Sequence, residues 1–98
     1  MPIEVVDNST ENRFEVLVDG KVAGFADYRL LPTKIVFTHT EVLPAYEGQG
    51  LASKLVAFAL QASADTGLRV VPLCPYVAKY IERHPEFQGL VDGSFGSG

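Results

Sequence analysis

The sequence predicts a mixed α/β (α+β) domain. A four-stranded antiparallel meander continues through a β-α-β crossover to a fifth strand and a C-terminal helix. Three observations predict this fold. The first half of the chain alternates apolar and polar residues with a period of two, which is typical of strands. Residues 48–64 change to a spacing of three and four, which indicates a helix. A β-rich stretch at residues 68–73 and a proline-initiated stretch from Pro75 then follow.

The first three strands are predicted by alternation and by turn residues. Residues 3–7 form a short extended run, and a polar, turn-like stretch separates them from residues 13–19. The second strand alternates, and the apolar side chains on one of its faces are Phe14, Val16 and Val18. Asp19-Gly20 is typical of a two-residue type I′ hairpin turn, so residues 21–31 are predicted to return antiparallel.

A fourth strand is predicted over residues 34–43, after the break at Leu31-Pro32-Thr33. Its first half is apolar on both faces, which favours a central place in the sheet. The helix at residues 48–64 follows directly. Its apolar residues, spaced by three or four, are Leu51, Leu55, Phe58, Ala59 and Ala62.

Glycine and proline residues predict where the helices in the last third of the chain begin and end. Gly67 caps the long helix, and Pro75 begins a helix that runs to about Arg83. His84, before Pro85, is expected to cap the end of that helix. We predict a single domain over residues 1–87, and a flexible tail over residues 88–98, which are rich in Gly and Ser.

Composition excludes several functional classes. Eight Lys and Arg against twelve Asp and Glu give a net charge of −4, which disfavours nucleic-acid binding. One cysteine allows no internal disulfide and no Cys-rich zinc site, and we expect no metal. No apolar run is long enough to span a membrane, and the N-terminus lacks the features of a signal peptide. We therefore expect a cytoplasmic protein that is a monomer or a weak dimer.

The motif that carries chemistry is the turn between the fourth strand and the long helix. It reads Glu47-Gly48-Gln49-Gly50-Leu51-Ala52-Ser53. A helix N-terminus has unpaired N–H groups and a partial positive charge, and glycines let an anion approach the backbone closely. The pattern matches neither the dinucleotide fingerprint nor the P-loop. Glycines that only punctuate a turn are the alternative interpretation.

These residues resemble the pyrophosphate-binding loop of GNAT-type N-acetyltransferases, whose pattern is Gln/Arg-x-x-Gly-x-Gly/Ala. Gly50 and Ala52 match, whereas Glu47 departs from Gln/Arg. Three further strings resemble a small single-domain GNAT-like subgroup, and the likeness spans roughly residues 13–87. They are His39-Thr40-Glu41-Val42, Cys74-Pro75-Tyr76-Val77-Ala78-Lys79-Tyr80-Ile81 and His84-Pro85-Glu86-Phe87.

The resemblance implies acetyl-coenzyme A as the cofactor. In that family the strands before and after the long helix are parallel and splay apart, and pantetheine lies in the gap. The resemblance places the pantetheine against backbone at Glu41, Val42 and Leu43. It places the pyrophosphate on the turn and first helical residues: Glu47, Gly48, Gln49, Gly50, Leu51, Ala52 and Ser53.

Four residues are candidates for catalysis. His39 and Glu41 are two apart on one strand and so share a face, where they could relay a proton from the amine. Cys74 precedes the helix that begins at Pro75, a place that favours thiolate; it either accepts the acetyl group or only lines the thioester site. Tyr80 resembles the family tyrosine that protonates the departing thiolate. Packing roles are the alternative for each of the four.

Two functions remain open from the sequence. The first is an acetyl-CoA-dependent N-acetyltransferase acting on a primary amine, either a small polyamine-like molecule or a protein lysine. The second is a non-catalytic module that binds coenzyme A and regulates a partner. The acidic first half of the chain, residues 1–49, favours a cationic acceptor.

Overall fold

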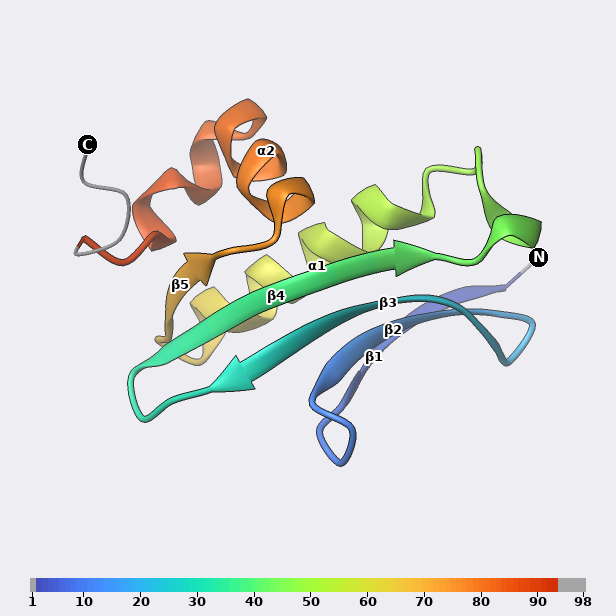
Figure 1. The fold of residues 1–98 in the computed structure, drawn as a ribbon, viewed down its shortest axis with the longest axis horizontal. Helices are drawn as coiled ribbons and strands as arrows, with labels where there is room; N and C mark the ends of the chain where they lie inside the picture. The colour runs from blue at the N-terminus through green and yellow to red at the C-terminus, as the bar shows by residue number, and fades with distance from the viewer. Residues whose placement is uncertain (1, 94–98) are drawn as a thin grey trace.

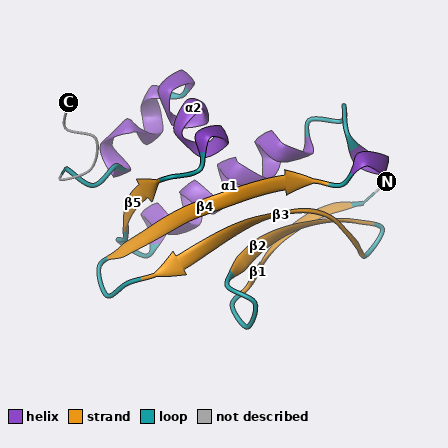
Figure 2. Ribbon diagram, viewed as in Figure 1, coloured by secondary structure: helices purple, strands orange, loops and turns teal. Residues whose placement is uncertain are grey.

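Each predicted strand and helix is present in the computed structural model, which describes residues 2–93. Figure 1 shows their arrangement, and Figure 2 shows the strands as one layer. The strands are β1 (Ile3–Asn8), β2 (Arg13–Val18), β3 (Lys21–Leu30), β4 (Lys34–Val42) and β5 (Arg69–Pro72). The helices are α1 (Leu51–Asp65) and α2 (Pro75–Arg83), with short 3₁₀ turns η1 (Pro44–Tyr46) and η2 (Pro85–Leu90).

The sheet has the order β1-β2-β3-β4-β5, as the sequence predicts. The first four strands pair antiparallel, and β4 pairs parallel with β5 through the crossover helix α1. Asp19 and Gly20 both have positive φ, as the predicted hairpin turn requires. Gly67, also at positive φ, follows the C-terminal end of α1.

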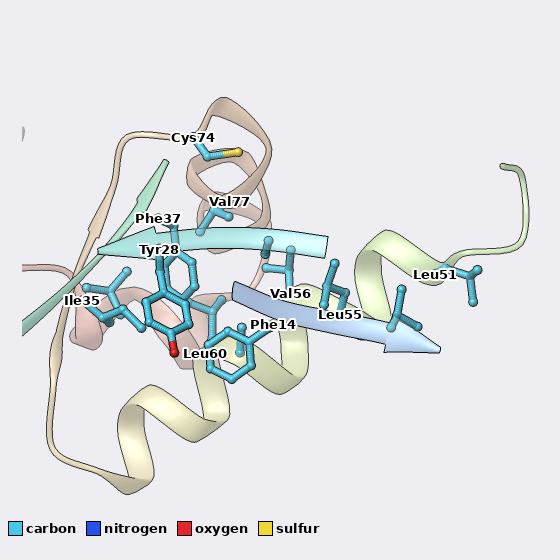
Figure 3. Packing of buried hydrophobic residues seen from close by; sticks show 14 of the residues in the cluster. Phe14, Tyr28, Ile35, Phe37, Leu51, Leu55, Val56, Leu60, Cys74 and Val77 are labelled. Atoms are coloured by element: carbon cyan, nitrogen blue, oxygen red, sulfur yellow. The ribbon is translucent and has the colours of Figure 1, made fainter. Parts of the chain in front are cut away.

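The core lies between α1 and one face of the sheet, which we call the inner face. Phe14, Val16 and Val18 of β2 are buried there, as their alternation predicts. Figure 3 shows Phe14, Tyr28 and Ile35 on this face, with Val56 and Leu60 of α1 among the buried residues. The opposite face, the outer face, carries the alternate side chains of each strand.

Two features of α1 differ from the prediction. It begins at Leu51 rather than residue 48, because Gly48 and Gly50 have the left-handed φ values of +82° and +72°. Phe58 was expected on the buried stripe but is 45% exposed, whereas the neighbouring Val56 and Leu60 are buried. The small residues on this stripe, among them Ala59, left the register of the buried face weakly specified by the sequence.

The segment after α2 also differs from the predicted tail. The sequence suggests that residues after 87 are flexible, but η2 continues to Leu90 and Val91 forms a bridge to Val70 of β5. Asp92 is buried and its carboxylate pairs with Lys34 at 2.7 Å. The side chains of Phe87, Leu90 and Val91 pack against the core. These apolar contacts and the ion pair therefore hold the segment in place. The rest of the predicted tail, residues 94–98, lies outside the described residues.

Candidate active site

A bulge in β4 sets the faces on which the candidate residues lie. Tyr28 of β3 pairs with Phe37, but the adjacent Asp27 pairs with His39, so Thr38 is an extra residue. Strict alternation from buried Phe37 would turn His39 inward. The bulge turns His39 outward instead, and it turns Thr40, the cross-strand partner of buried Ala26, inward.

His39 and Glu41 form a pair on the outer face. His39 Nε2 lies 3.1 Å from Glu41 Oε1, and the two side chains are 57% and 48% exposed. The ring of Phe25 lies beside His39, with centroids 6.1 Å apart, and the Arg13 guanidinium lies 4.6 Å above the Phe25 ring. The predicted shared face is therefore present, and an aromatic ring and a cation adjoin it.

Cys74 lies on the other side of the strand. Its thiol donates to Thr40 Oγ1 at 3.3 Å, and the residue is only 3% exposed. Its backbone N–H donates to the carbonyl of Phe37 at 2.9 Å, which connects the chain after β5 to β4. The β4–β5 register ends at Phe37 and Pro72. Beyond Phe37, β4 continues to Val42 with no described strand on that edge.

The glycine turn lies where β4 ends. Leu43 still bonds back to Ala23 of β3, η1 follows, and residues 47–50 are exposed. Gly50 is the N-cap of α1 and carries no side chain, so no side-chain cap satisfies the first N–H groups of the helix. A methyl group added at Gly48 or Gly50 would meet nothing within 4 Å, so the turn is open toward solvent.

The first turn of α1 meets α2 beside this loop. Ser53 Oγ lies 3.3 Å from the Tyr76 hydroxyl, and the two helices bound a small cavity of about 120 Å³. Its lining has a basic side: Lys79 and Arg83 line it together with Tyr80 and His84. These residues share one face of α2 because they are spaced by three or four.

Tyr80 is held by its neighbours. Its ring stacks on His84 with centroids 3.8 Å apart, and His84 Nδ1 lies 2.7 Å from the Tyr80 carbonyl. This bond fits the predicted role of His84 at the end of α2. Burial, with smaller contributions from Glu86 and Tyr76, raises the pKa of Tyr80 above its ordinary value. The hydroxyl therefore keeps its proton at neutral pH.

The candidate residues thus divide between two places. Ser53 and Tyr80 line the cavity between α1 and α2, and Cys74 lies at the N-terminus of α2 against Thr40 of β4, whereas His39 and Glu41 lie across the strand from Cys74. Within residues 2–93, no group of three or more His, Cys, Asp or Glu is arranged to hold a metal ion. No helix in this part of the chain is long and apolar enough to cross a membrane.

Sequence reasoning missed three residues. Thr40 is the hydroxyl against Cys74, and its inward direction depends on a bulge that alternation does not reveal. Lys79 and Arg83 line the cavity beside Ser53. Each follows a tyrosine, Tyr76 or Tyr80, by three residues, and this spacing could have placed both on the same helix face as the tyrosines.

Comparison with known proteins assigns this chain to a family. A family model described as GCN5-related N-acetyl-transferase matches residues 13–90. The chain belongs to the GCN5-related N-acetyltransferase family. It is 31% identical over 86 residues to Protein NATD1 of Gallus gallus and of Mus musculus, an alignment that covers 86% of this chain and 78% of each relative.

Solved structures support the GNAT fold. A GCN5-like protein of Staphylococcus aureus matches with a TM-score of 0.68 at 21% identity, covering 91% of this chain and 87% of that one. A ribosomal-protein-alanine N-acetyltransferase from Brucella melitensis matches at 0.58 and 20% identity, covering 76% and 59%. AAC(6′)-Iy in complex with the bisubstrate analogue CoA-S-monomethyl-acetylneamine matches at 0.50 and 20%, covering 78% and 59%.

Proposed function

We propose that this chain transfers an acetyl group from acetyl-CoA to a primary amine. The observation that carries the proposal is the edge of β4 beyond Phe37, which pairs with no strand within residues 2–93 and runs into the glycine turn at the N-terminus of α1. Backbone N–H and C=O groups on such an edge can bond an extended amide-containing chain. The adjoining helix N-terminus suits a phosphate. Pantetheine and pyrophosphate are joined in this order in coenzyme A.

The residues present fit this cofactor. Exposed Gly48 and Gly50 leave the N-terminus of α1 open to a pyrophosphate, and Leu51, Ala52 and Ser53 supply the backbone N–H groups of the first helical turn. Lys79 and Arg83, on the wall of the cavity beside Ser53, suit a further phosphate group. The β4 edge at Glu41, Val42 and Leu43 would bond the pantetheine amides. The match between a CoA bisubstrate complex and this fold supports the same cofactor.

When bound, acetyl-CoA supplies a thioester as the acetyl donor. In the transfer, the amine nitrogen forms a bond to the acetyl carbon, the C–S bond breaks, and the amine loses a proton. Glu41 and His39, in contact with each other at 3.1 Å, are the groups that we propose to take that proton. Tyr80, whose pKa is raised by burial, is the proposed donor of a proton to the sulfur. Cys74 lines the thioester site.

The acceptor arrives as an ammonium ion and loses one proton to water, which frees the nitrogen lone pair before the transfer step. Residues 1–49 hold four basic and eight acidic residues, whereas residues 50–98 hold four of each. The outer face, where Glu41 lies beside Phe25, belongs to the acidic half. A polyamine-like molecule or a protein lysine suits such a surface, because it presents an ammonium group to carboxylates.

Cofactor binding and turnover are tested separately. Acetyl-CoA at about one hundred times its Kd should stabilise the fold by about 2.7 kcal/mol in a thermal unfolding experiment. Release of free CoA thiol is then measured over a panel of polyamines and lysine peptides. Stabilisation without thiol release would favour the regulatory module instead. No stabilisation at millimolar acetyl-CoA would refute both functions.

A matched pair of variants tests the loop. Gly50 and Gly67 lie at opposite ends of α1, both have positive φ, and neither has an atom within 4 Å of an added Cβ. Gly50→Val and Gly67→Val therefore introduce similar backbone strain. We expect only Gly50→Val to lose acetyl-CoA binding. Equal affinities in the two variants would contradict the phosphate assignment.

A further inference from the structure

A second cavity lies away from the candidate active site. It has a volume of about 630 Å³ and lies between the inner face of the sheet and the C-terminal half of α1. Ala62, Ser63 and Thr66 of α1 form one wall, and Leu30 and Leu31 lie at the β3–β4 turn. Figure 1 shows that turn and the β4–α1 loop at opposite ends of β4. From Gly50 to Ala62, α1 advances about 18 Å.

The lining of this cavity is mainly apolar. Phe14, Tyr28 and Ile35 contribute from the sheet (Figure 3), and Leu68 contributes from the chain before β5. Leu30 and Leu31, at its edge, are 60% and 42% exposed. The volume is in the range of small-molecule sites, which are typically concave, apolar and marked by a few polar groups.

One charged group marks this cavity. Among the described residues that line it, Asp7 is the only charged one. The Tyr28 hydroxyl donates to Asp7 Oδ1 at 2.7 Å, which holds the carboxylate in place at the apolar wall. An ionised carboxylate has about four acceptor positions, so this one bond leaves others open. The other hydroxyls in the lining, of Ser63 and Thr66, bond to α1 carbonyls.

We propose that this cavity binds an amphipathic monocation, with the alkyl or aromatic body against Phe14, Tyr28 and Ile35 and the ammonium group on Asp7. The chemistry of the occupant follows from the charge of Asp7 and from the apolar walls of the cavity. The apolar walls require an apolar body, and the single carboxylate selects a single positive charge over a neutral or anionic head group. The site is separate from acetyl transfer, because His39 and Glu41 lie on the outer face near the other end of β4.

The test uses three probes with the same body: hexylamine, hexanol and hexanoate. Each is titrated to about 10 mM against the ¹⁵N-labelled full chain without cofactor, a range suited to millimolar affinity. We expect shifts of the backbone amides of Leu30, Leu31, Thr66 and Leu68. Hexylamine should bind about fivefold more tightly than hexanol, as expected for a partly exposed ion pair, and hexanoate most weakly.

Variants separate charge from shape. Asp7→Asn keeps an acceptor for Tyr28 and should abolish the preference for hexylamine while retaining hexanol binding. Glu4→Gln, on the same strand but the outer face, should leave the preference unchanged. Ala62→Leu, which adds volume to the wall, should weaken all three probes.

Several outcomes would overturn the proposal. They are the absence of shifts at the cavity, equal binding of hexylamine and hexanol, or retention of the preference in Asp7→Asn. Shifts of the same amides with protein concentration alone would assign the cavity to a second copy of the chain, which also overturns it. If Asp7→Asn does not fold, the probe comparison in the unchanged chain and in Asp7→Glu, which keeps the charge, still decides.

Discussion

The two faces of β4 differ sharply over the three residues from His39 to Glu41. On the outer face, His39 and Glu41 are about half exposed and contact each other. On the inner face, the Thr40 hydroxyl accepts a hydrogen bond from the thiol of Cys74, which is almost fully buried. One short stretch of strand therefore places an exposed His–Glu pair and a buried thiol–hydroxyl contact back to back. Under the proposed function, acceptor chemistry and thioester placement occur on different sides of the strand.

The most severe test of this division is Glu41→Gln. The substitution removes the carboxylate from His39 but leaves the inner face intact. If Glu41 takes the amine proton, kcat/KM should fall about 10²- to 10⁴-fold, and the acidic limb of the pH–rate profile should change. Affinity for acetyl-CoA should stay within about twofold, because the cofactor side is untouched.

The matched control is Glu11→Gln, which removes the same charge from the β1–β2 turn. It should leave kcat/KM unchanged. An unaltered pH–rate profile in Glu41→Gln would show that Glu41 is not the base. A parallel loss of cofactor affinity would show that the two faces are not separate.

The next largest effect is expected at Gly24, which holds β3 close to β4 at Glu41. A Cβ built at Gly24 would lie 2.7 Å from the Glu41 carbonyl oxygen, and that oxygen belongs to the backbone. Gly24→Ala must therefore push the two strands apart, at a cost of about 1–3 kcal/mol in the free energy of unfolding. Gly89→Ala is the control, because nothing lies within 4 Å of its added Cβ. Urea unfolding measures both; equal stability of the two variants would contradict the close approach.

On the inner face, Tyr28 is expected to make the free energy of unfolding depend on pH in the alkaline range. Burial, then the hydrogen bond to Asp7, raises the pKa of Tyr28 from 10.0 to about 12. Because the unfolded chain ionises first, the stability contribution is complete below pH 10 and declines as the pH rises toward 12. The unchanged chain should lose up to about 1.4 kcal/mol per pH unit more than Tyr28→Phe in this window. Urea unfolding at pH 9, 10 and 11 measures the difference, and parallel curves would contradict the shift.

How far the sequence predicts this molecule can be judged at particular residues. The strands, their order and the crossover follow from period-two alternation, the Asp19-Gly20 turn and the change of period at the helix. The shared face of His39 and Glu41 also follows from alternation. The direction in which that face points does not, because the extra residue Thr38 in β4 reverses it. A bulge depends on pairing with β3, and no local pattern in the sequence marks it.

Other misses have a similar origin in long-range contacts. Residues 88–92 look like a tail because Gly and polar residues dominate, yet Val91 pairs with Val70 and Asp92 pairs with Lys34. The basic side of the small cavity, at Lys79 and Arg83, arises only when α2 packs against Ser53. Tertiary packing supplied what local propensity could not.

The smallest effect is expected for Cys74→Ala, and it sharpens the contrast between the faces. A cysteine that carries the acetyl group must reach both the thioester and the amine, but Cys74 is 3% exposed on the inner face and its thiol donates a hydrogen bond to Thr40 Oγ1. Glu41 and His39, the groups proposed to accept the amine proton, lie across the strand.

Direct transfer should therefore continue without the thiol, and kcat should stay within about threefold of the unchanged chain. Mass spectrometry after incubation with acetyl-CoA should find no acetyl group on Cys74. A loss of about 100-fold or more, together with an acetylated Cys74 in the unchanged chain, would move the nucleophile to the inner face. That outcome would end the separation of duties between the faces of β4.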